Sequence, residues 1–283
     1  MLNYGFTLLD NKTFIFSSDK ENIEFLNEFI KILNLEKKDK EPYKKFFFIS
    51  SLPEKEKKLK KIFFKNLTIY FNNENIFCKL KSNLDYDSKI LVMENIISFL
   101  SYYIILDGGF FLHSGLIQFG NKGILLAGGG GFGKSTVCKV LSSNFKVLCD
   151  DELILLPYFD KYVVHPLPTF SDYLIDLKYK KIKNNFYSNV EDYSFVSFIF
   201  ILQKSKENKI LPLSLNKSLI FLYNLSFQVS FLPYIKDNSF RELKKVLFSN
   251  ILKTVKDIPV FLFKFNNTEE SYKELKNFIN EEL

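Results

Sequence analysis

The sequence predicts an α/β protein with a mixed β-sheet, and three observations support this class. Short apolar runs of strand length alternate along the 283 residues with longer segments in which apolar residues recur at helical spacing. Hydrophobic residues make up 47% and charged residues 25% of the chain, which is typical of a folded globular protein. Ten of the 11 glycines lie between Gly108 and Gly133, so unusual backbone geometry is concentrated in one short window.

Residues 1–107 are predicted to form an N-terminal α+β region. Apolar runs at 2–9 and 13–17 indicate a hairpin, and the residues that follow carry apolar side chains at the spacing of a helix, namely Ile23, Leu26, Ile30 and Leu33. Further strands are predicted at 46–50, 61–64, 67–71 and 76–80. Residues 89–106 predict a helix that leads directly into the glycine-rich window.

Residues 108–283 are predicted to form a second domain that contains this window. Its predicted strands lie at 123–127, 146–149, 152–156, 162–164, 194–202 and 259–265. Its predicted helices lie at 135–142, 216–225, 240–255 and 268–283. The basic polar segment 178–185 is typical of a flexible loop.

One segment of the window fits the P-loop pattern G-x-x-x-x-G-K-[ST]. Glycines allow consecutive N–H groups to turn inward around an anion, and a helix beginning near Gly133 adds the positive end of its dipole. Lys134 can reach the β- and γ-phosphates of a nucleotide, and the Ser135 hydroxyl can bind Mg²⁺. The residues predicted to bind the nucleotide are Gly128, Gly129, Gly130, Gly131, Phe132, Gly133, Lys134, Ser135 and Thr136.

The same glycines also satisfy the weaker dinucleotide-binding pattern G-x-G-x-x-G. That pattern needs an acidic residue about 20 positions later, and Asp150 and Asp151 stand near this spacing. Spacing therefore does not separate the two interpretations. The pair Lys134-Ser135 favours the P-loop, because a dinucleotide-binding turn needs neither side chain.

Acidic residues follow the predicted strand at 146–149. Asp150, Asp151 and Glu152 come directly after its last residue. Carboxylates at the end of a strand beside a P-loop are typical of the second half of a nucleotide–Mg²⁺ site. We therefore expect ATP and Mg²⁺ as cofactors.

Three segments resemble the catalytic core of HPr kinase/phosphorylase, which shares its architecture with phosphoenolpyruvate carboxykinase. They are the run Phe111-Leu112-His113-Ser114-Gly115-Leu116-Ile117, the P-loop, and the run Val147-Leu148-Cys149-Asp150-Asp151-Glu152-Leu153. The later run Pro166-Leu167-Pro168 is similar to a segment of HPr-kinase-related proteins of about this length. The resemblance implies that residues 108–283 are a P-loop kinase-like catalytic domain with a mixed β-sheet core of this type.

The resemblance also implies a role for each matched residue. Lys134 would neutralise the transferring phosphoryl group, and Asp151 would be the base that accepts the proton of an acceptor hydroxyl. His113 corresponds to a histidine near the phosphate. Ser135 and Asp150 would hold Mg²⁺. Charge neutralisation and one positioned carboxylate are also what phosphoryl transfer requires on chemical grounds.

These observations predict an ATP- and Mg²⁺-dependent kinase acting on a hydroxyl of a peptide, protein or small molecule. No glycine follows Gly133, so the later Glu-(apolar)-Arg-Gly signature of HPr kinases is absent. That absence leaves open a second function, a nucleotide-binding regulatory or assembly module without phosphotransfer. A nucleotide-hydrolysing switch is a third, less favoured alternative. By analogy with the family, a homo-oligomer is also expected.

Two residues outside the matched motifs are weaker candidates for the site. His165 precedes Pro166 and is predicted to be a loop residue that could border the site. Arg241 is the one arginine available as an arginine finger, but its place at a predicted helix start favours exposure to solvent.

Composition argues against several other classes of protein. The net charge is +7, but 38 of the 39 basic residues are lysine, whereas arginine is preferred for base and phosphate contacts, so no nucleic-acid partner is expected. No run of 18 apolar residues occurs, and the N-terminus lacks a secretion-signal pattern, so neither a membrane span nor export is expected. Three cysteines without C-x-x-C spacing suit a reducing cytoplasm.

Overall fold

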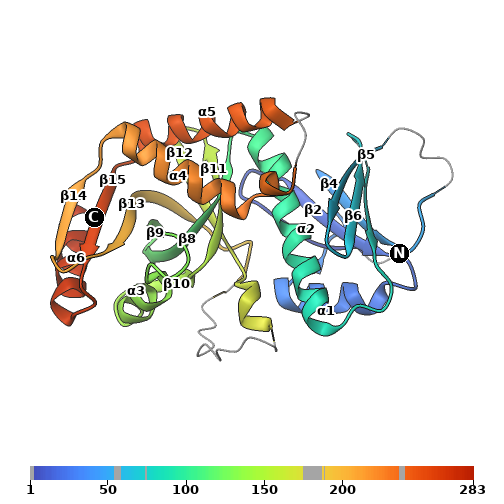
Figure 1. Ribbon diagram of the computed structural model, residues 1–283, viewed down its shortest axis with the longest axis horizontal. Helices are drawn as coiled ribbons and strands as arrows, with labels where there is room; N and C mark the ends of the chain where they lie inside the picture. Colours follow the sequence, from blue (N-terminus) through green and yellow to red (C-terminus); the bar gives the residue numbers. More distant parts are fainter. Residues whose placement is uncertain (1–2, 54–58, 74, 175–186, 188, 236–239) are drawn as a thin grey trace.

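The computed structural model describes residues 3–53, 59–73, 75–174, 187, 189–235 and 240–283, and it is a mixed α/β fold as predicted (Figure 1). Two β-sheets lie side by side along the longest axis of the molecule, with one long helix between them (Figure 1). The predicted flexible loop at 178–185 lies outside the described residues.

The first sheet contains seven strands in the order β3-β1-β2-β4-β7-β6-β5. It is mixed, because β2–β4 and β4–β7 pair in parallel and the other neighbours are antiparallel. Its helix, α1 (Ile23–Leu33), buries Phe25 and Phe29 against Phe48 of the sheet. The strands are β1 (Tyr4–Thr7), β2 (Thr13–Ser18), β3 (Glu36–Lys37), β4 (Lys44–Ile49), β5 (Lys60–Phe64), β6 (Leu67–Phe71) and β7 (Asn75–Leu80).

The second sheet contains eight strands and is also mixed. Five of them pair in a closed ring, in which β8 meets β11, β11 meets β12, β12 meets β13, β13 meets β9, and β9 returns to β8. The strands are β8 (Phe110–Phe119), β9 (Lys122–Ala127), β10 (Lys146–Cys149), β11 (Glu152–Tyr158), β12 (Lys161–Leu167), β13 (Ser194–Lys204), β14 (Lys209–Pro212) and β15 (Val260–Phe265).

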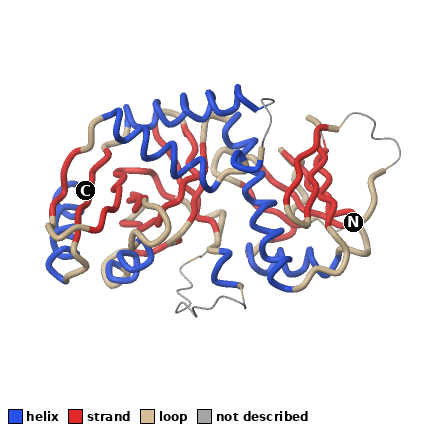
Figure 2. Tube along the Cα trace, viewed as in Figure 1, coloured by secondary structure: helices blue, strands red, loops and turns tan. Residues whose placement is uncertain are grey.

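Helices cover both faces of the second sheet (Figure 2). In β9, Leu125 and Ala127 belong to one hydrophobic cluster and Ile124 and Leu126 to another, so alternate side chains serve opposite faces. The first cluster includes α2 (Tyr86–Leu106), α4 (Leu215–Val229) and α5 (Arg241–Asp257). The second includes α3 (Lys134–Leu141) and α6 (Glu269–Glu282). Two short 3₁₀ turns, η1 (Phe170–Tyr173) and η2 (Leu232–Tyr234), complete the described elements.

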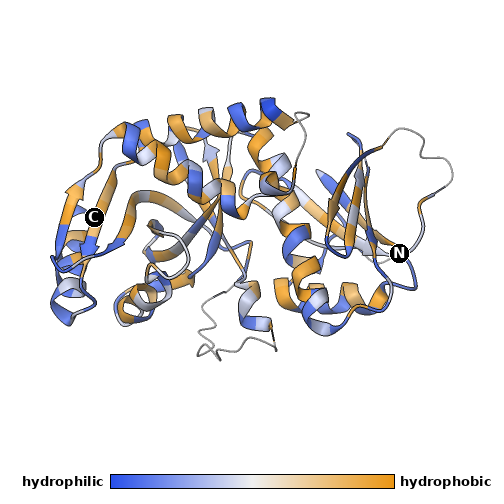
Figure 3. Ribbon diagram, in the orientation of Figure 1, coloured by the Kyte–Doolittle hydropathy of each residue, from blue (hydrophilic) through white to orange (hydrophobic). Residues whose placement is uncertain are grey.

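The first cluster runs across both sheets and through α2, so the two sheets share one core. The ribbon coloured by hydropathy shows apolar and polar faces on α1, α4 and α5, as expected for helices with one side against a core (Figure 3). The sheets separate at α2, next to the predicted boundary between residues 107 and 108. That division into two domains stays a prediction.

Helix α2 is long and apolar enough to cross a membrane by length and composition alone. However, 61% of its most apolar 18-residue window is buried inside the protein, as in a core helix. The carboxylate of Asp85 caps its N-terminus by accepting a hydrogen bond from Ser88 N at 2.7 Å. The helix therefore begins three residues earlier than the hydrophobic spacing predicts.

Candidate functional site

The site forms at the midpoint of β8, where its neighbours change. The β8–β9 ladder ends at the pair Ser114–Ala127, and the β8–β11 ladder begins at the pair His113–Glu152. The backbone holds both departing segments, because Gly128 N donates to His113 O at 3.2 Å and Ser114 N donates to Asp151 O at 2.8 Å. The glycine loop (residues 128–133) and the acidic junction (Asp150-Asp151) consequently lie beside the same two adjacent residues of β8.

The glycine loop turns sharply into α3, as predicted. Gly131 and Gly133 have φ values of 81° and 96°, which side-chain-bearing residues rarely adopt, and Gly133 is the N-cap of the helix. A Cβ on Gly115 of β8 would lie 2.6 Å from Cys138 Sγ, so this glycine lets α3 approach the sheet closely. Phe132, at the tip of the loop, is 44% exposed. The geometry leaves the first turn of α3 facing a cleft.

Lys134 extends from the first turn of α3 into the interior, and only 5% of its surface is exposed. Its Nζ donates to Gly128 O at 3.0 Å and lies 2.7 Å from His113 Nε2 and 3.7 Å from Asp151 Oδ1. Burial lowers the pKa of Lys134, and the negative charges of Asp151 and Asp150 oppose that shift. The acidic junction therefore helps to keep this buried amine protonated.

His113 and Asp151 form the second contact of the cluster. His113 Nε2 lies 2.9 Å from Asp151 Oδ1, and the same nitrogen faces Lys134 Nζ. One imidazole nitrogen either donates or accepts, so it satisfies only one of these partners at a time. Asp151 and Lys134 thus compete for His113, and the proton distribution in the cluster depends on what else binds there.

Asp150 and Ser135 face the same cleft, which has a volume of about 550 Å³. Asp150 is 4% exposed, and Thr169 Oγ1 donates to its Oδ1 at 2.9 Å. Carboxylate and hydroxyl oxygens are hard donors that suit Mg²⁺. The described part of the chain contains no group of three His, Cys, Asp or Glu side chains placed to hold a metal.

Several residues that line the cleft were not predicted from the sequence. Lys204 arrives at the end of β13, because β13 runs parallel to β9 and both strands end at the same edge. Thr169 and Ser171 follow β12 and close the opposite side, together with Asp172. Lys139 lies one turn along α3 from the glycine loop. Lys204 could not be predicted as a cleft residue, because no local motif in the sequence shows that β9 and β13 pair in parallel.

Two glutamates lie beside the acidic junction. Burial raises the pKa of Glu152 well above its ordinary value, and the charges of Asp151 and Glu94 raise it further. Burial also raises the pKa of Glu94 on α2, with a contribution from Asp151. Glu152 was visible in the sequence as the third acidic residue. Glu94 was not, because it lies 57 positions before Asp151 on a helix with no motif.

The two weaker candidates lie elsewhere. The prediction that His165 is a loop residue is wrong, since it lies within β12 and is fully buried. It accepts from Leu9 N at 3.3 Å through Nε2 and donates to Val190 O at 3.0 Å through Nδ1. Pro166 is tolerated because the β12–β13 pairing ends at Val164. Arg241 is exposed at the start of α5 and does not line the cleft, as expected.

The fold and the site together define a mixed α/β protein in which a lysine-bearing glycine loop faces an acidic strand junction. Within this class, the chain belongs to the ScmC family. The model of that family, described as SynChlorMet cassette protein ScmC, matches residues 76–279, which is more than half of the chain. The matched region includes α2, the whole second sheet and every cleft residue named above.

Other comparisons add little about activity. Among solved structures, the HPr(Ser) kinase/phosphatase from Coxiella burnetii is similar at 12% sequence identity, over 60% of this chain and 88% of that chain, with a TM-score of 0.33. A TM-score this low carries no argument about function. No curated protein matches the sequence.

Proposed function

We propose that this chain is a kinase that uses ATP and Mg²⁺ to phosphorylate a hydroxyl group of a peptide, protein or small molecule. One observation carries the proposal. Lys134 Nζ and Asp151 Oδ1 lie 3.7 Å apart beneath a glycine loop at a helix N-terminus, in a cleft open to solvent. A cation for the phosphoryl group and a carboxylate for the incoming hydroxyl are thereby adjacent.

The glycine loop supports the binding of the nucleotide. Its backbone N–H groups and the N-terminus of α3 form a P-loop-like site for the β- and γ-phosphates. Lys134 would turn from Gly128 O and Asp151 toward the γ-phosphate, which is a stronger partner for a buried ammonium. Ser135 and Asp150 would hold Mg²⁺, which when bound neutralises charge on the phosphate oxygens.

Asp151 is the group proposed to accept the proton of the acceptor. In the structure it is engaged by His113 and Lys134. When Lys134 turns to the phosphate, Asp151 would keep its contact with His113 and would still line the cleft. His113 would then orient the carboxylate and donate to it. Oriented in this way, Asp151 can accept a hydroxyl hydrogen bond in line with the phosphoryl group.

The decisive test is phosphotransfer by the Asp151→Asn variant. We expect ATP affinity to change by only a few-fold, because the glycine loop and Lys134 remain. Turnover should fall about 100-fold or more, the usual contribution of a positioned base. Radiolabelled ATP reports transfer, and Asp172→Asn, on the rim of the same cleft, is the matched control. Wild-type turnover by Asp151→Asn would overturn the role of Asp151.

The choice of acceptors follows from the family's name, which describes a cassette. Peptides and proteins encoded beside the chain are therefore the first acceptors to test. ATP binding without any phosphorylated product across these acceptors would favour the regulatory or assembly module instead. That module remains the second candidate, because Asp151 and Lys134 are already paired with each other in the structure. Hydrolysis without an acceptor would favour a nucleotide-hydrolysing switch.

A further inference from the structure

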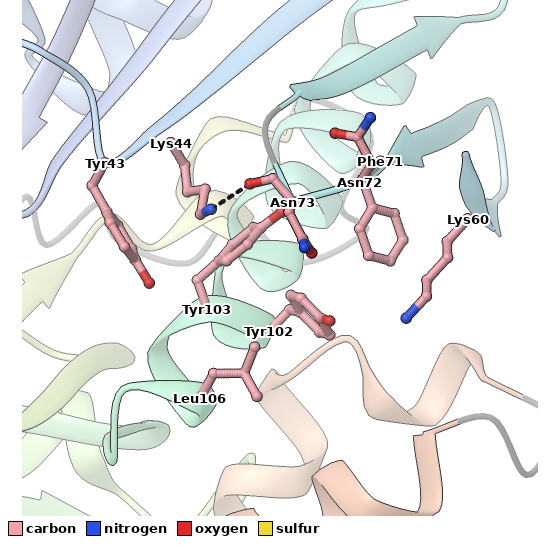
Figure 4. A pocket seen from close by; sticks show the side chains of 9 residues that line it. All are labelled: Tyr43, Lys44, Lys60, Phe71, Asn72, Asn73, Tyr102, Tyr103 and Leu106. Atoms are coloured by element: carbon pink, nitrogen blue, oxygen red, sulfur yellow. Dashed lines mark hydrogen bonds between the residues drawn. The ribbon is translucent and has the colours of Figure 1, made fainter. Parts of the chain in front are cut away.

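A second cavity lies between the first sheet and the C-terminal end of α2. Its volume is about 480 Å³, and it shares no lining residue with the glycine-loop cleft. Residues of β4, β5, β6 and α2 meet there, so segments distant in the sequence build one pocket (Figure 4). Nothing in the proposed kinase reaction uses these residues.

The walls of this pocket are aromatic. Tyr43, Phe71, Tyr102 and Tyr103 surround it, with Leu106 at one end (Figure 4). The rings support one another, because Phe71 and Tyr102 meet edge-on with centroids 5.4 Å apart and Tyr43 meets Tyr103 edge-on at 6.3 Å. Phe71 and Tyr103 are only 1% and 4% exposed. The pocket is therefore a preformed slot suited to a planar ring.

Two lysines add positive charge to the slot. Lys44 Nζ lies 4.9 Å from the centroid of the Tyr103 ring and donates to Asn73 O at 2.8 Å. Lys60 extends toward the slot from the opposite wall (Figure 4). Within the described residues, neither amine has a carboxylate at ion-pair distance. An apolar slot flanked by two such ammonium groups favours an anion.

A third feature is an unsatisfied hydroxyl in the wall. The Oη atom of Tyr103 is buried and has no hydrogen-bond partner among the residues that the structure describes. Buried hydroxyl groups are nearly always hydrogen-bonded, so this group is an exception. Lys44 lies over the same ring. The Tyr103 hydroxyl is closed off from solvent, so a ligand oxygen beside Lys44 would reach it only after a shift of the pocket wall.

We propose that this pocket binds an aromatic carboxylate, with its ring between the aromatic walls and its carboxylate between Lys44 and Lys60. The ligand is either a free small molecule or the C-terminal residue of a peptide, since both present the same chemistry. The site is spatially separate from the proposed nucleotide site, because the two share no lining residue. Six of its nine lining residues precede residue 76 and so lie outside the region that the family model matches.

The chain contains no tryptophan, so an indole ligand excited at wavelengths where tyrosine absorbs little can be followed without a tryptophan background from the protein. The probes are indole-3-acetate and a tripeptide that ends in tryptophan with a free carboxylate. Indole-3-acetamide and the amidated tripeptide are their uncharged counterparts. We expect saturable binding of at least one acid and about tenfold weaker binding of its amide. Tighter binding of indole-3-acetate would indicate a free small molecule as the ligand, and tighter binding of the tripeptide would indicate a peptide C-terminus.

Variants locate the bound probe. Lys44→Gln and Lys60→Gln should each weaken binding of the acid about tenfold. Lys61→Gln is the matched control, because neighbouring residues of β5 point to opposite faces of the sheet, and it should bind as the wild type does. Circular dichroism and the thermal midpoint confirm that each variant is folded. Equal loss in Lys61→Gln would mean a nonspecific charge effect and would overturn the proposal.

Two further outcomes would also count against the site. If acid and amide bind equally, the lysines do not recognise a carboxylate. If ATP with Mg²⁺ competes with the probe completely, so that saturating ATP abolishes probe binding, the probe occupies the nucleotide cleft rather than this pocket. Unchanged probe binding by Lys134→Met, with loss of ATP binding, would support two independent sites and would separate this proposal from the fate of the kinase proposal.

Discussion

Lys134 and His113 share a hydrogen bond, with 2.7 Å between Nζ of the lysine and Nε2 of the histidine. One of these two nitrogens must therefore lack the proton that points along the contact. The neighbouring carboxylates favour a lysine that keeps its proton along this contact, because Asp151 and Asp150 raise the pKa of Lys134 against the effect of its burial. In this arrangement, His113 Nε2 is an acceptor.

The Lys134→Met variant should lose nucleotide binding while remaining folded. Methionine fills the volume of the lysine stem, and the buried ammonium that would meet the phosphates is gone. We expect ATP affinity to fall about 100-fold or more, as for loss of one preorganised charged donor. Titration calorimetry measures this change. Lys139→Met, an exposed lysine on the rim of the same cleft, should bind ATP within a few-fold of the wild type.

Gly133→Ala should destabilise the protein, and Gly130→Ala should not. Gly133 has a φ of 96°, and a Cβ there would lie 3.1 Å from the Phe265 ring, whereas a Cβ on Gly130 would meet nothing within 4 Å. We expect a loss of about 1–2 kcal/mol for Gly133→Ala and less than about 0.5 kcal/mol for Gly130→Ala. Urea denaturation provides the comparison. Equal stabilities would show that the loop does not hold this backbone geometry.

His165 should make stability depend on pH between about 4 and 6.5. Burial lowers its pKa from 6.5 to about 4, so the unfolded chain binds a proton in this window and the folded chain does not. Stability is therefore fully present above pH 6.5 and is lost as the pH falls toward 4, by about 3 kcal/mol in total. The free energy of unfolding is measured against pH for wild type and His165→Gln. Parallel curves for the two proteins would refute this assignment.

Glu152→Gln should stabilise the protein most at alkaline pH. The raised pKa of Glu152 means that the folded state binds its proton more tightly than the unfolded state does, so stability falls as the pH rises above 4.5. A neutral glutamine avoids this loss and the repulsion by Asp151 and Glu94. The advantage of the variant in thermal midpoint should thus grow from pH 5 to pH 8. Glu41→Gln, at an exposed position, is the control and should show no such trend.

A stabilised Glu152→Gln variant would also test whether this acid serves the reaction. Natural proteins retain destabilising charges mainly where activity needs them. Reduced phosphotransfer in the more stable variant would connect Glu152 with catalysis. Unchanged transfer would assign it to folding alone.

Much of the architecture could be predicted, because the signals are local. Apolar spacing located every helix and most strands to within a few residues, and the glycine pattern located the turn between β9 and α3. Three strands escaped prediction, β3, β8 and β14. Strands β3 and β14 are two and four residues long and mostly exposed, so they carry little hydrophobic signal. Strand β8 is buried over most of its length, so its apolar residues do not alternate with polar ones. His165 was misplaced because a following proline usually indicates an extended or turn segment outside the core.

The composition of the cleft was only partly predictable. Lys134, Ser135, Asp150 and Asp151 stand in motifs with fixed spacing. Lys204 reaches the cleft because β9 pairs in parallel with β13. Glu94 comes near Asp151 because of the way α2 packs. The aromatic slot is an extreme case, because Tyr43, Phe71 and Tyr103 come from three elements and no local pattern relates them. The composition of such a site depends on which distant elements pack together in the fold.

Helix α2 connects the acidic junction of the cleft with the aromatic slot. Glu94, beside the acidic junction, and Tyr102, in the aromatic slot, are eight residues apart on it, about 12 Å along its axis. A continuous helix moves as a unit. If an occupant of the slot rotated α2 slightly about its axis, the carboxyl group of Glu94 near Asp151 would therefore also be displaced. Any such linkage would be reciprocal: a nucleotide that changed the charge around Asp151 would then alter the affinity for the distant occupant by the same free energy.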